Sequence, residues 1–380
     1  MGALSLVKDS LSPEEIERVI ESTRRLKEAQ EQEDSPEAKA TLPRLGLEDI
    51  EREAKKLPIE VETLPDATIL KHAVQSNGIL YVDVGFDFSD ISADDLILLP
   101  LLTRMLTETG TSQLSEDALT HLIGAETGGI SASYSTDLKS TGGRVSDPLD
   151  VSLFFFLRGK ATADKIPSLF NIMKMVLLDA NLSNQKRAIE MLKETKARRE
   201  TQIITNGHTY GASRLGARYT LLGYVGEVTG GLTYVRGLGA LIEQAEKDWP
   251  SLERRLNNLK NSIVRRLDSK KLILNLTGED RILSAAKDSS LEFLNSIPKA
   301  VQESQAQNLV KSFAASQLLP MVNEGFAVPA QVNYVVKGGS LFEQGEYVKS
   351  SYNVVSKYLS TGYLWDNVRV MGGAYGGFMR

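Results

Sequence analysis

Cysteine is absent from this chain of 380 residues, and histidine occurs only three times, as His72, His121 and His208. The lack of cysteine excludes disulfides, thiolate metal ligands and a cysteine nucleophile. No histidine has a second histidine or a glutamate at the spacing that zinc sites use, and neither H-x-x-E-H nor its inverse occurs. We therefore expect that this chain, taken alone, binds no metal ion or other cofactor.

Long hydrophobic runs are also missing, since the longest, Leu96 to Leu102, is far too short to span a bilayer. The net charge of -5 and the lack of a basic stripe with interleaved aromatic residues argue against a nucleic-acid partner. The start, "MGALSLVKDSLSPEE", has neither the apolar centre of a signal peptide nor the Arg/Ser-rich character of a transit peptide. The sequence thus predicts no membrane partner and no targeting segment.

Charged residues dominate the first part of the chain, residues 1–57, which differs from the rest. Ser12 is the expected N-cap of a charged helix, with Pro13 at its first position and Glu15 completing a capping box. A second, shorter helical run is expected after the Pro/Ala-rich turn that follows. We interpret 1–57 as a charged helical hairpin or linker, and the alternative is a solvated arm without a function of its own.

Alternating strands and helices occupy residues 58–300 and predict an α+β domain. The dipeptide Asn77-Gly78 predicts a hairpin between two strands, and Gly110 the end of a buried helix. Later strands, "ISASYSTD", "VSLFFFLRGKA" and "LILNLTG", are separated by helices. This order predicts an antiparallel sheet with helices over one face.

A second unit of the same type is expected to begin in residues 301–380, with the strand "AQVNYVVKGG" and the helix "YNVVSKYLSTGYLW". A unit of this size has too few partners to bury a face by itself. We therefore interpret it as the start of a second, truncated α+β domain.

Glycines surround two hydrogen-bond donors in the last stretch, "RVMGGAYGGFMR". Arg369 is permanently charged and Tyr375 is neutral, and both could converge on a peptide carbonyl or stabilise an oxyanion. In the alternative interpretation, Arg369 pairs with a surface carboxylate and Tyr375 fills a gap in a turn. The glycines that would let another chain approach closely are Gly372, Gly373, Gly376 and Gly377.

A second glycine-rich stretch is "NGHTYGASRLGARYT", from Asn206 to Thr220. It matches no dinucleotide-binding fingerprint, and the chain has no P-loop and no G-x-S-x-G elbow. The stretch could place a polar patch beside a cavity. We favour the alternative that its small residues permit a close helix crossing while the polar ones cap the start of a helix.

Four stretches together resemble the C-terminal half of the presequence-protease family: "QVNYVVKGG", "GYLWDNVRVMGGAYGGF", "GEVTGGLTYVRGL" and "GAETGGISAS". That family belongs to the pitrilysin/insulinase superfamily of zinc metallopeptidases and is close to falcilysin. The resemblance runs through nearly the whole chain and includes the charged helices at its start. Its most specific part is "LWDNVRVMGGAYGGF".

The resemblance implies four related α+β domains that form two halves closing around a chamber. Zinc is expected in the N-terminal half, which this chain lacks, so the chain would be inactive unless that half were supplied elsewhere. Arg369 and Tyr375 match the residues that the family points toward the substrate. Leu101, Arg104 and Met105 stand where zinc ligands and a catalytic base would be, so residues 58–300 look like a non-catalytic repeat.

The expected function is therefore that of a C-terminal-half fragment of a metalloendopeptidase that degrades unstructured, presequence-type peptides in mitochondria or chloroplasts. The fragment would contribute substrate binding rather than zinc. One alternative is a non-catalytic module that binds extended peptides by edge-strand pairing. Another is a partial gene product without function, whose exposed apolar surface promotes aggregation.

Overall fold

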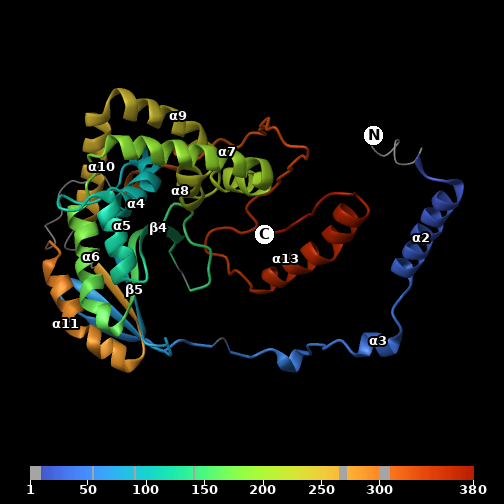
Figure 1. Ribbon diagram of the computed structural model, residues 1–380, viewed down its shortest axis with the longest axis horizontal. Helices are drawn as coiled ribbons and strands as arrows, with labels where there is room; N and C mark the ends of the chain where they lie inside the picture. The colour runs from blue at the N-terminus through green and yellow to red at the C-terminus, as the bar shows by residue number, and fades with distance from the viewer. Residues whose placement is uncertain (1–9, 54, 90, 140–141, 265–271, 299–308) are drawn as a thin grey trace. The chain divides into compact units, whose positions relative to one another are not determined.

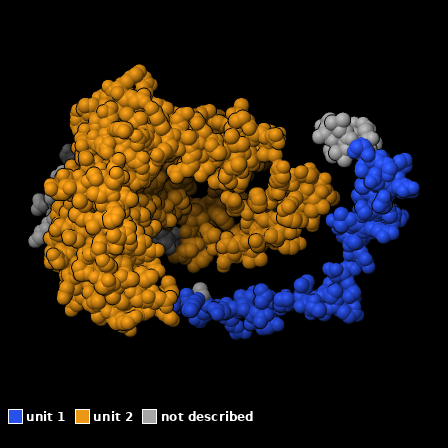
Figure 2. Space-filling view, viewed as in Figure 1, with its two compact units in different colours: residues 1–56 blue, residues 57–380 orange. Residues whose placement is uncertain are grey.

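The computed structural model describes residues 10–53, 55–89, 91–139, 142–264, 272–298 and 309–380. The chain divides into two compact units, Met1–Lys56 and Leu57–Arg380 (Figure 2). The expected boundary between the two α+β domains, at residue 300, lies outside the described residues.

The first unit contains a long charged helix, α2 (Pro13–Glu31), a short helix, α3 (Pro36–Ala40), and one turn of 3-10 helix, η1 (Leu47–Asp49). The predicted capping box is confirmed, because Ser12 Oγ accepts from the Glu15 amide at 3.3 Å and the Ser12 amide donates to the Glu15 carboxylate at 2.8 Å. The second helical run is much shorter than expected, and none of residues 50–53 and 55–57 is helical. Short exposed helices are unstable unless they pack against something.

The second unit is built on one sheet with the strand order β1-β2-β6-β3-β5-β4 (Figure 1). All neighbouring pairs are antiparallel except β2 with β6, which is parallel. The strands are β1 (Glu60–Thr63), β2 (Ala67–Ala73), β3 (Ile79–Asp87), β4 (Ile130–Leu138), β5 (Val151–Thr162) and β6 (Leu272–Gly278).

The Asn77-Gly78 turn forms as predicted, with φ of 54° and 79°, but the hairpin does not. Strand β6 lies between β2 and β3 and pairs with both of them. The local turn signal reverses the chain, whereas the pairing is decided by a strand that follows much later in the sequence. The hairpin prediction was therefore wrong about the strands that the turn joins.

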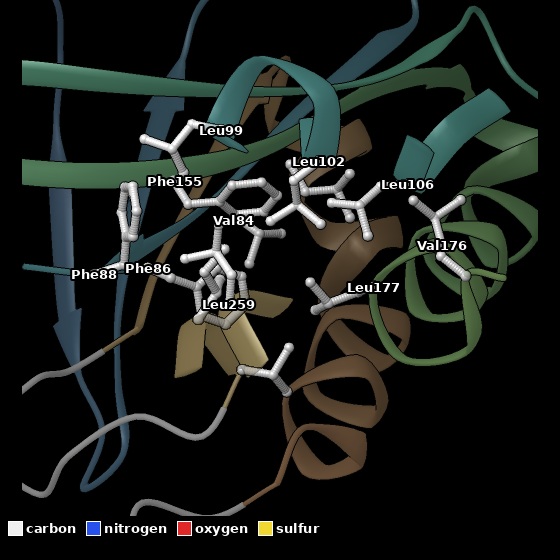
Figure 3. Close-up of a cluster of buried hydrophobic side chains, with 14 of the residues drawn as sticks. Val84, Phe86, Phe88, Leu99, Leu102, Leu106, Phe155, Val176, Leu177 and Leu259 are labelled. Atoms are coloured by element: carbon white, nitrogen blue, oxygen red, sulfur yellow. The ribbon is translucent and has the colours of Figure 1, made fainter. Parts of the chain in front are cut away.

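Helices cover one face of this sheet, as the order of elements predicted. Along β3 the side chains of Leu80, Val82, Val84 and Phe86 are fully buried, while the alternate residue Tyr81 is exposed. Figure 3 shows this core, in which sheet residues meet side chains from the surrounding helices. The helices up to the last strand are α4 (Leu99–Glu108), α5 (Glu116–Glu126), α6 (Ile166–Asp179), α7 (Gln185–Gly216), α8 (Leu221–Gly230), α9 (Leu232–Lys247) and α10 (Trp249–Val264), and α11 (Asp280–Ser296) follows it.

The described chain after α11 has little regular structure. It contains α12 (Leu309–Ser312), the 3-10 turn η4 (Ala315–Gln317), α13 (Ser351–Thr361) and the π-helix η5 (Trp365–Val370). Helix α13 agrees with the prediction. The stretch 330–339 was predicted to be a strand and is in none, because no neighbouring strand pairs with it. Within the described residues, no helix is both long and apolar enough to cross a membrane.

Candidate functional site

The predicted site lies in a segment that we call the C-terminal turn (Leu364–Arg380). It begins with π-helix η5, in which the Met371 amide donates to the Asp366 carbonyl at 2.9 Å. The chain then reverses, and the amides of Gly373 and Ala374 donate to the carbonyls of Arg369 and Val368 at 3.0 and 3.1 Å. Single π-helical turns occur frequently at functional sites.

Two glycines are required by this geometry. Gly373 has a φ of +69°, a conformation that other residues rarely adopt. A Cβ atom on Gly372 would lie 2.6 Å from the Val368 carbonyl oxygen, so no larger residue fits without a backbone shift. Gly376 lies against the Phe378 ring and Gly377 against Val368. The glycine pattern therefore describes a tight turn that folds back on η5.

The two predicted donors project from this turn. The Arg369 guanidinium carbon lies 4.1 Å from the centre of the Trp365 ring, one helical turn earlier, which is a cation–π contact. Within the described part of the chain, no carboxylate pairs with Arg369. Tyr375 is 87% exposed, so it does not fill a gap in the turn. Both side chains are therefore accessible, and the stacked guanidinium keeps its hydrogen-bonding edges free for an incoming carbonyl or carboxylate.

Helix α4 occupies the place where the family resemblance puts the zinc helix. Leu101 is 2% exposed and Met105 is fully buried. Arg104 donates to Glu108 at 3.0 Å and to Glu194 at 2.9 Å, which uses both carboxylates in ion pairs. These residues pack the core and fix α7, and they do not fit a zinc ion. No group of three or more His, Asp or Glu side chains that could hold a metal exists among the residues that the structure describes.

The glycine-rich stretch that begins at Asn206 lies inside α7, which has non-helical dihedral angles at that residue. A Cβ atom on Gly207 would lie 2.2 Å from the Tyr334 ring, and one on Gly211 would lie 2.7 Å from Val336. The small residues thus permit the close approach of an extended segment, not of the helix that we predicted. The polar residues do not cap a helix start. The stretch also lines a groove of about 840 Å³ between α7 and the segment 321–338.

An ion cluster holds the extended segment to α7. Arg214 donates to Glu324 at 2.9 and 2.7 Å, and Arg218 also pairs with Glu324. Arg214 further contacts Glu227, a fully buried carboxylate that accepts from the Thr233 amide at 2.9 Å. The guanidinium of Arg214, together with Arg218, lowers the pKa of Glu324 to about 2.

Sequence reasoning missed three of these residues. Trp365 was part of the resemblance, but its place under Arg369 could have been found only from the helical spacing of four residues. Glu227 lies in an apolar, glycine-rich helix, where a single carboxylate signals a buried partner. Glu324 carries no local signal, because its partners are more than 100 residues away in the sequence.

Comparison with known families now adds to this geometry. The family model for the region associated with peptidases of family M16, subfamily C, matches residues 2–241, which is more than half of the chain. The chain belongs to this peptidase-associated family. A second model, "PreP C-terminal domain", matches residues 323–380 and therefore includes the whole C-terminal turn. The resemblance stated from the sequence is confirmed at the level of the family.

Relatives of this peptidase-associated chain include presequence protease 1, chloroplastic/mitochondrial, of Arabidopsis thaliana, which is 34% identical over 99% of this chain and 33% of that protein. Protein HypA of Clostridium perfringens is 27% identical over 99% of this chain and 37% of that protein. The chain thus spans about a third of the length of these curated relatives. A solved structure, the peptidase M16 inactive domain from Pseudomonas fluorescens, is 16% identical with a TM-score of 0.43 and covers 66% of this chain and 53% of that chain.

Proposed function

We propose that this chain is the substrate-binding, C-terminal part of a presequence-degrading metallopeptidase and acts together with a separate part that holds zinc. The observation that carries the proposal is the pair of accessible donors, Arg369 and Tyr375, on one tight turn. This turn lies in the segment that matches the PreP C-terminal domain. Bound there, a peptide would place a carbonyl against both donors, which would also stabilise an oxyanion.

The proposal assigns no metal to this chain. Helix α4 is filled by buried side chains and by an ion-paired arginine, so its residues do not suit a zinc ion. When bound elsewhere in the enzyme, zinc would activate water for attack on the scissile carbonyl. The residues of this chain would bind and orient the peptide, and the chain alone would cleave nothing.

The proposed substrates are unstructured targeting peptides. Two relatives with presequence protease names are described as chloroplastic/mitochondrial and as mitochondrial, which supports such substrates and those organelles. Transit peptides are rich in arginine and serine and poor in acidic residues. An extended peptide offers the backbone carbonyls that an arginine fork and a phenol can bind.

The test combines this chain with the remainder of the Arabidopsis relative, the part that this chain does not match, and a fluorogenic, arginine-rich presequence peptide. Cleavage should require both polypeptides and should stop when a chelator is added. Arg369→Ala should lower turnover at least about tenfold and leave the zinc content unchanged, because it removes a transition-state donor. Cleavage by this chain alone, or unchanged turnover in Arg369→Ala, would contradict the proposal.

A second candidate function is peptide binding by strand addition, without cleavage. One observation favours it. Between Phe326 and Tyr334 the side chains alternate between half-buried and exposed, as in a strand, although no strand pairs with this segment in the described structure. Unpaired backbone N–H and C=O groups of this kind are a template for an added strand.

Backbone-modified peptides separate the two candidates. Strand addition predicts that N-methylation at every second residue of a bound peptide abolishes binding, while methylation at the intervening residues has little effect. Binding governed by Arg369 and Tyr375 predicts no such alternation. Equal sensitivity at all positions would therefore argue against strand addition.

A further inference from the structure

Three aromatic rings meet where the kinked part of α7 approaches the C-terminal turn. The ring centre of His208 lies 5.8 Å from that of Tyr334 and 6.0 Å from that of Phe378. His208 follows Asn206, the residue with non-helical dihedral angles inside α7. Phe378 belongs to the same turn as Arg369 and Tyr375. His208 therefore stands between the helical layer and the turn that carries the two donors.

The Tyr334 side of this contact is fixed by close packing. Its ring lies where a Cβ atom of residue 207 would be, at 2.2 Å, so only glycine at that position admits the ring. Its hydroxyl donates to the Ile204 carbonyl at 2.8 Å, two residues before the kink. The ring that flanks His208 is thereby held against α7 by both shape and a hydrogen bond.

The Phe378 side is fixed to α13. The Met379 carbonyl accepts from Ser356 Oγ at 2.6 Å, and the Met379 amide donates to Ser360 Oγ at 3.0 Å. The Phe378 ring also lies against Gly376, where a Cβ atom would be 2.9 Å away. The backbone around Phe378 thus has a defined position on α13, and its contact with His208 sets the turn relative to α7.

We propose that His208 is a positioning residue, which acts through Phe378 to hold the C-terminal turn against α7 and so presents Arg369 and Tyr375 to a peptide. The last part of this inference rests on the proposed function, whereas the positioning of the turn does not. Neither His208 nor Phe378 needs to touch the peptide. The tyrosine and the glycine that share the contact explain why the histidine lies in a glycine-rich stretch.

The first test is hydrogen exchange in the full chain, read at the amides of Gly373 and Ala374, whose hydrogen bonds close the turn. Phe378→Ala should make both amides exchange about threefold to tenfold faster, as expected for the loss of one aromatic contact. Phe378 is 63% exposed, so this variant keeps the fold. Exchange at the wild-type rate in Phe378→Ala would overturn the inference.

Variants on the α7 side make the test specific. His208→Ala should match Phe378→Ala, and the double variant should exchange no faster than either single one, because both remove the same contact. His208→Phe keeps a ring and should restore the wild-type rate. The matched control is Thr209→Ala, an exposed neighbour on α7 that should change nothing. Additive effects of His208→Ala and Phe378→Ala would overturn the proposed pairing.

Peptide affinity separates this inference from the proposed function. The probe is a fluorescein-labelled, unstructured peptide of Arg, Ser, Leu and Ala, titrated with the full chain. Phe378→Ala should weaken binding about threefold to tenfold, in step with exchange. If Arg369→Ala weakens binding but Phe378→Ala does not, the positioning role is overturned and the proposed function stands. If exchange quickens in Phe378→Ala but neither variant changes affinity, the contact is supported and the proposed function fails.

Discussion

Helix α4 and the C-terminal turn differ in what surrounds their polar groups. In α4, Arg104 is enclosed by two carboxylates and its neighbours Leu101 and Met105 are buried. In the turn, Arg369 stacks on an aromatic ring and Tyr375 extends into solvent. Polar groups whose hydrogen bonds are used inside the protein support the fold, whereas accessible donors on a rigid turn remain able to bind a ligand.

The same contrast explains why the family resemblance does not transfer evenly along the chain. A domain of this family whose α4 position carries Leu101, Arg104 and Met105 keeps the packing of that helix without ligands for a metal. The turn keeps its glycines, which its geometry requires at Gly372 and Gly373. The following variants test this division through their effect on stability, from the largest expected effect to the smallest.

Met105→Ala should have the largest effect. It removes a fully buried side chain from the core under the sheet, and we expect a loss of about 3 kcal/mol in the free energy of unfolding. Urea denaturation of the full chain measures it. Met321→Ala is the matched control, since Met321 is 62% exposed and its replacement should cost less than about 0.5 kcal/mol. Equal effects would mean that α4 is not part of the core.

Glu324→Gln should come next and should depend on pH. The folded-state pKa of Glu324, about 2, lies below its unfolded value, so the ion pairs stabilise the protein above about pH 4.5 and are lost as the pH falls toward 2. We expect the variant to be about 2 kcal/mol less stable at neutral pH, and the difference to vanish near pH 2. Denaturation curves across this pH range provide the measurement.

Glu243→Gln is the control for that series. Its ion pair with Lys247 is on the surface, with side chains 63% and 73% exposed, and should contribute almost nothing at any pH. A difference between Glu324→Gln and wild type that stayed constant down to pH 2 would show that the ion cluster is not the source of the stability.

Gly373→Ala should have a smaller effect, confined to the turn. Nothing lies within 4 Å of a Cβ atom there, so the cost comes only from the positive φ and should be about 1 kcal/mol. Asparagine tolerates this conformation better, and Gly373→Asn should recover part of the loss. Hydrogen exchange at Ala374 reports the change, with Gly325→Ala as a control that has space and no positive φ. A larger loss with Asn than with Ala would contradict this account.

Arg369→Ala should have the smallest effect on stability, within about 0.5 kcal/mol of wild type, because the ring on which it stacks, that of Trp365, is itself exposed. Its affinity for the labelled peptide should nevertheless fall about tenfold. Arg254→Ala, an exposed substitution on α10, should alter neither quantity. A clear loss of stability in Arg369→Ala would remove the contrast between the turn and α4.

The predictions from sequence succeeded where a few neighbouring residues decide the outcome. The helix caps at Ser12 and Ser115, the helix end before Gly110 and the Asn77-Gly78 turn all form as expected. Each depends on a backbone conformation or a hydrogen bond within four residues. The failures concern pairing, because nothing near 330–339 indicates that this stretch lacks a strand partner.

The sequence by itself determined the family, the local helix and turn structure, and the presence of Arg369 and Tyr375 in one glycine-rich segment. Only the tertiary structure decided that β6 lies between β2 and β3, that Glu324 binds arginines of α7, and that His208 meets Phe378. The physical reason is distance along the chain. Local conformation follows from sterics and short-range hydrogen bonds, whereas contacts between distant segments depend on how all the buried surfaces pack at once.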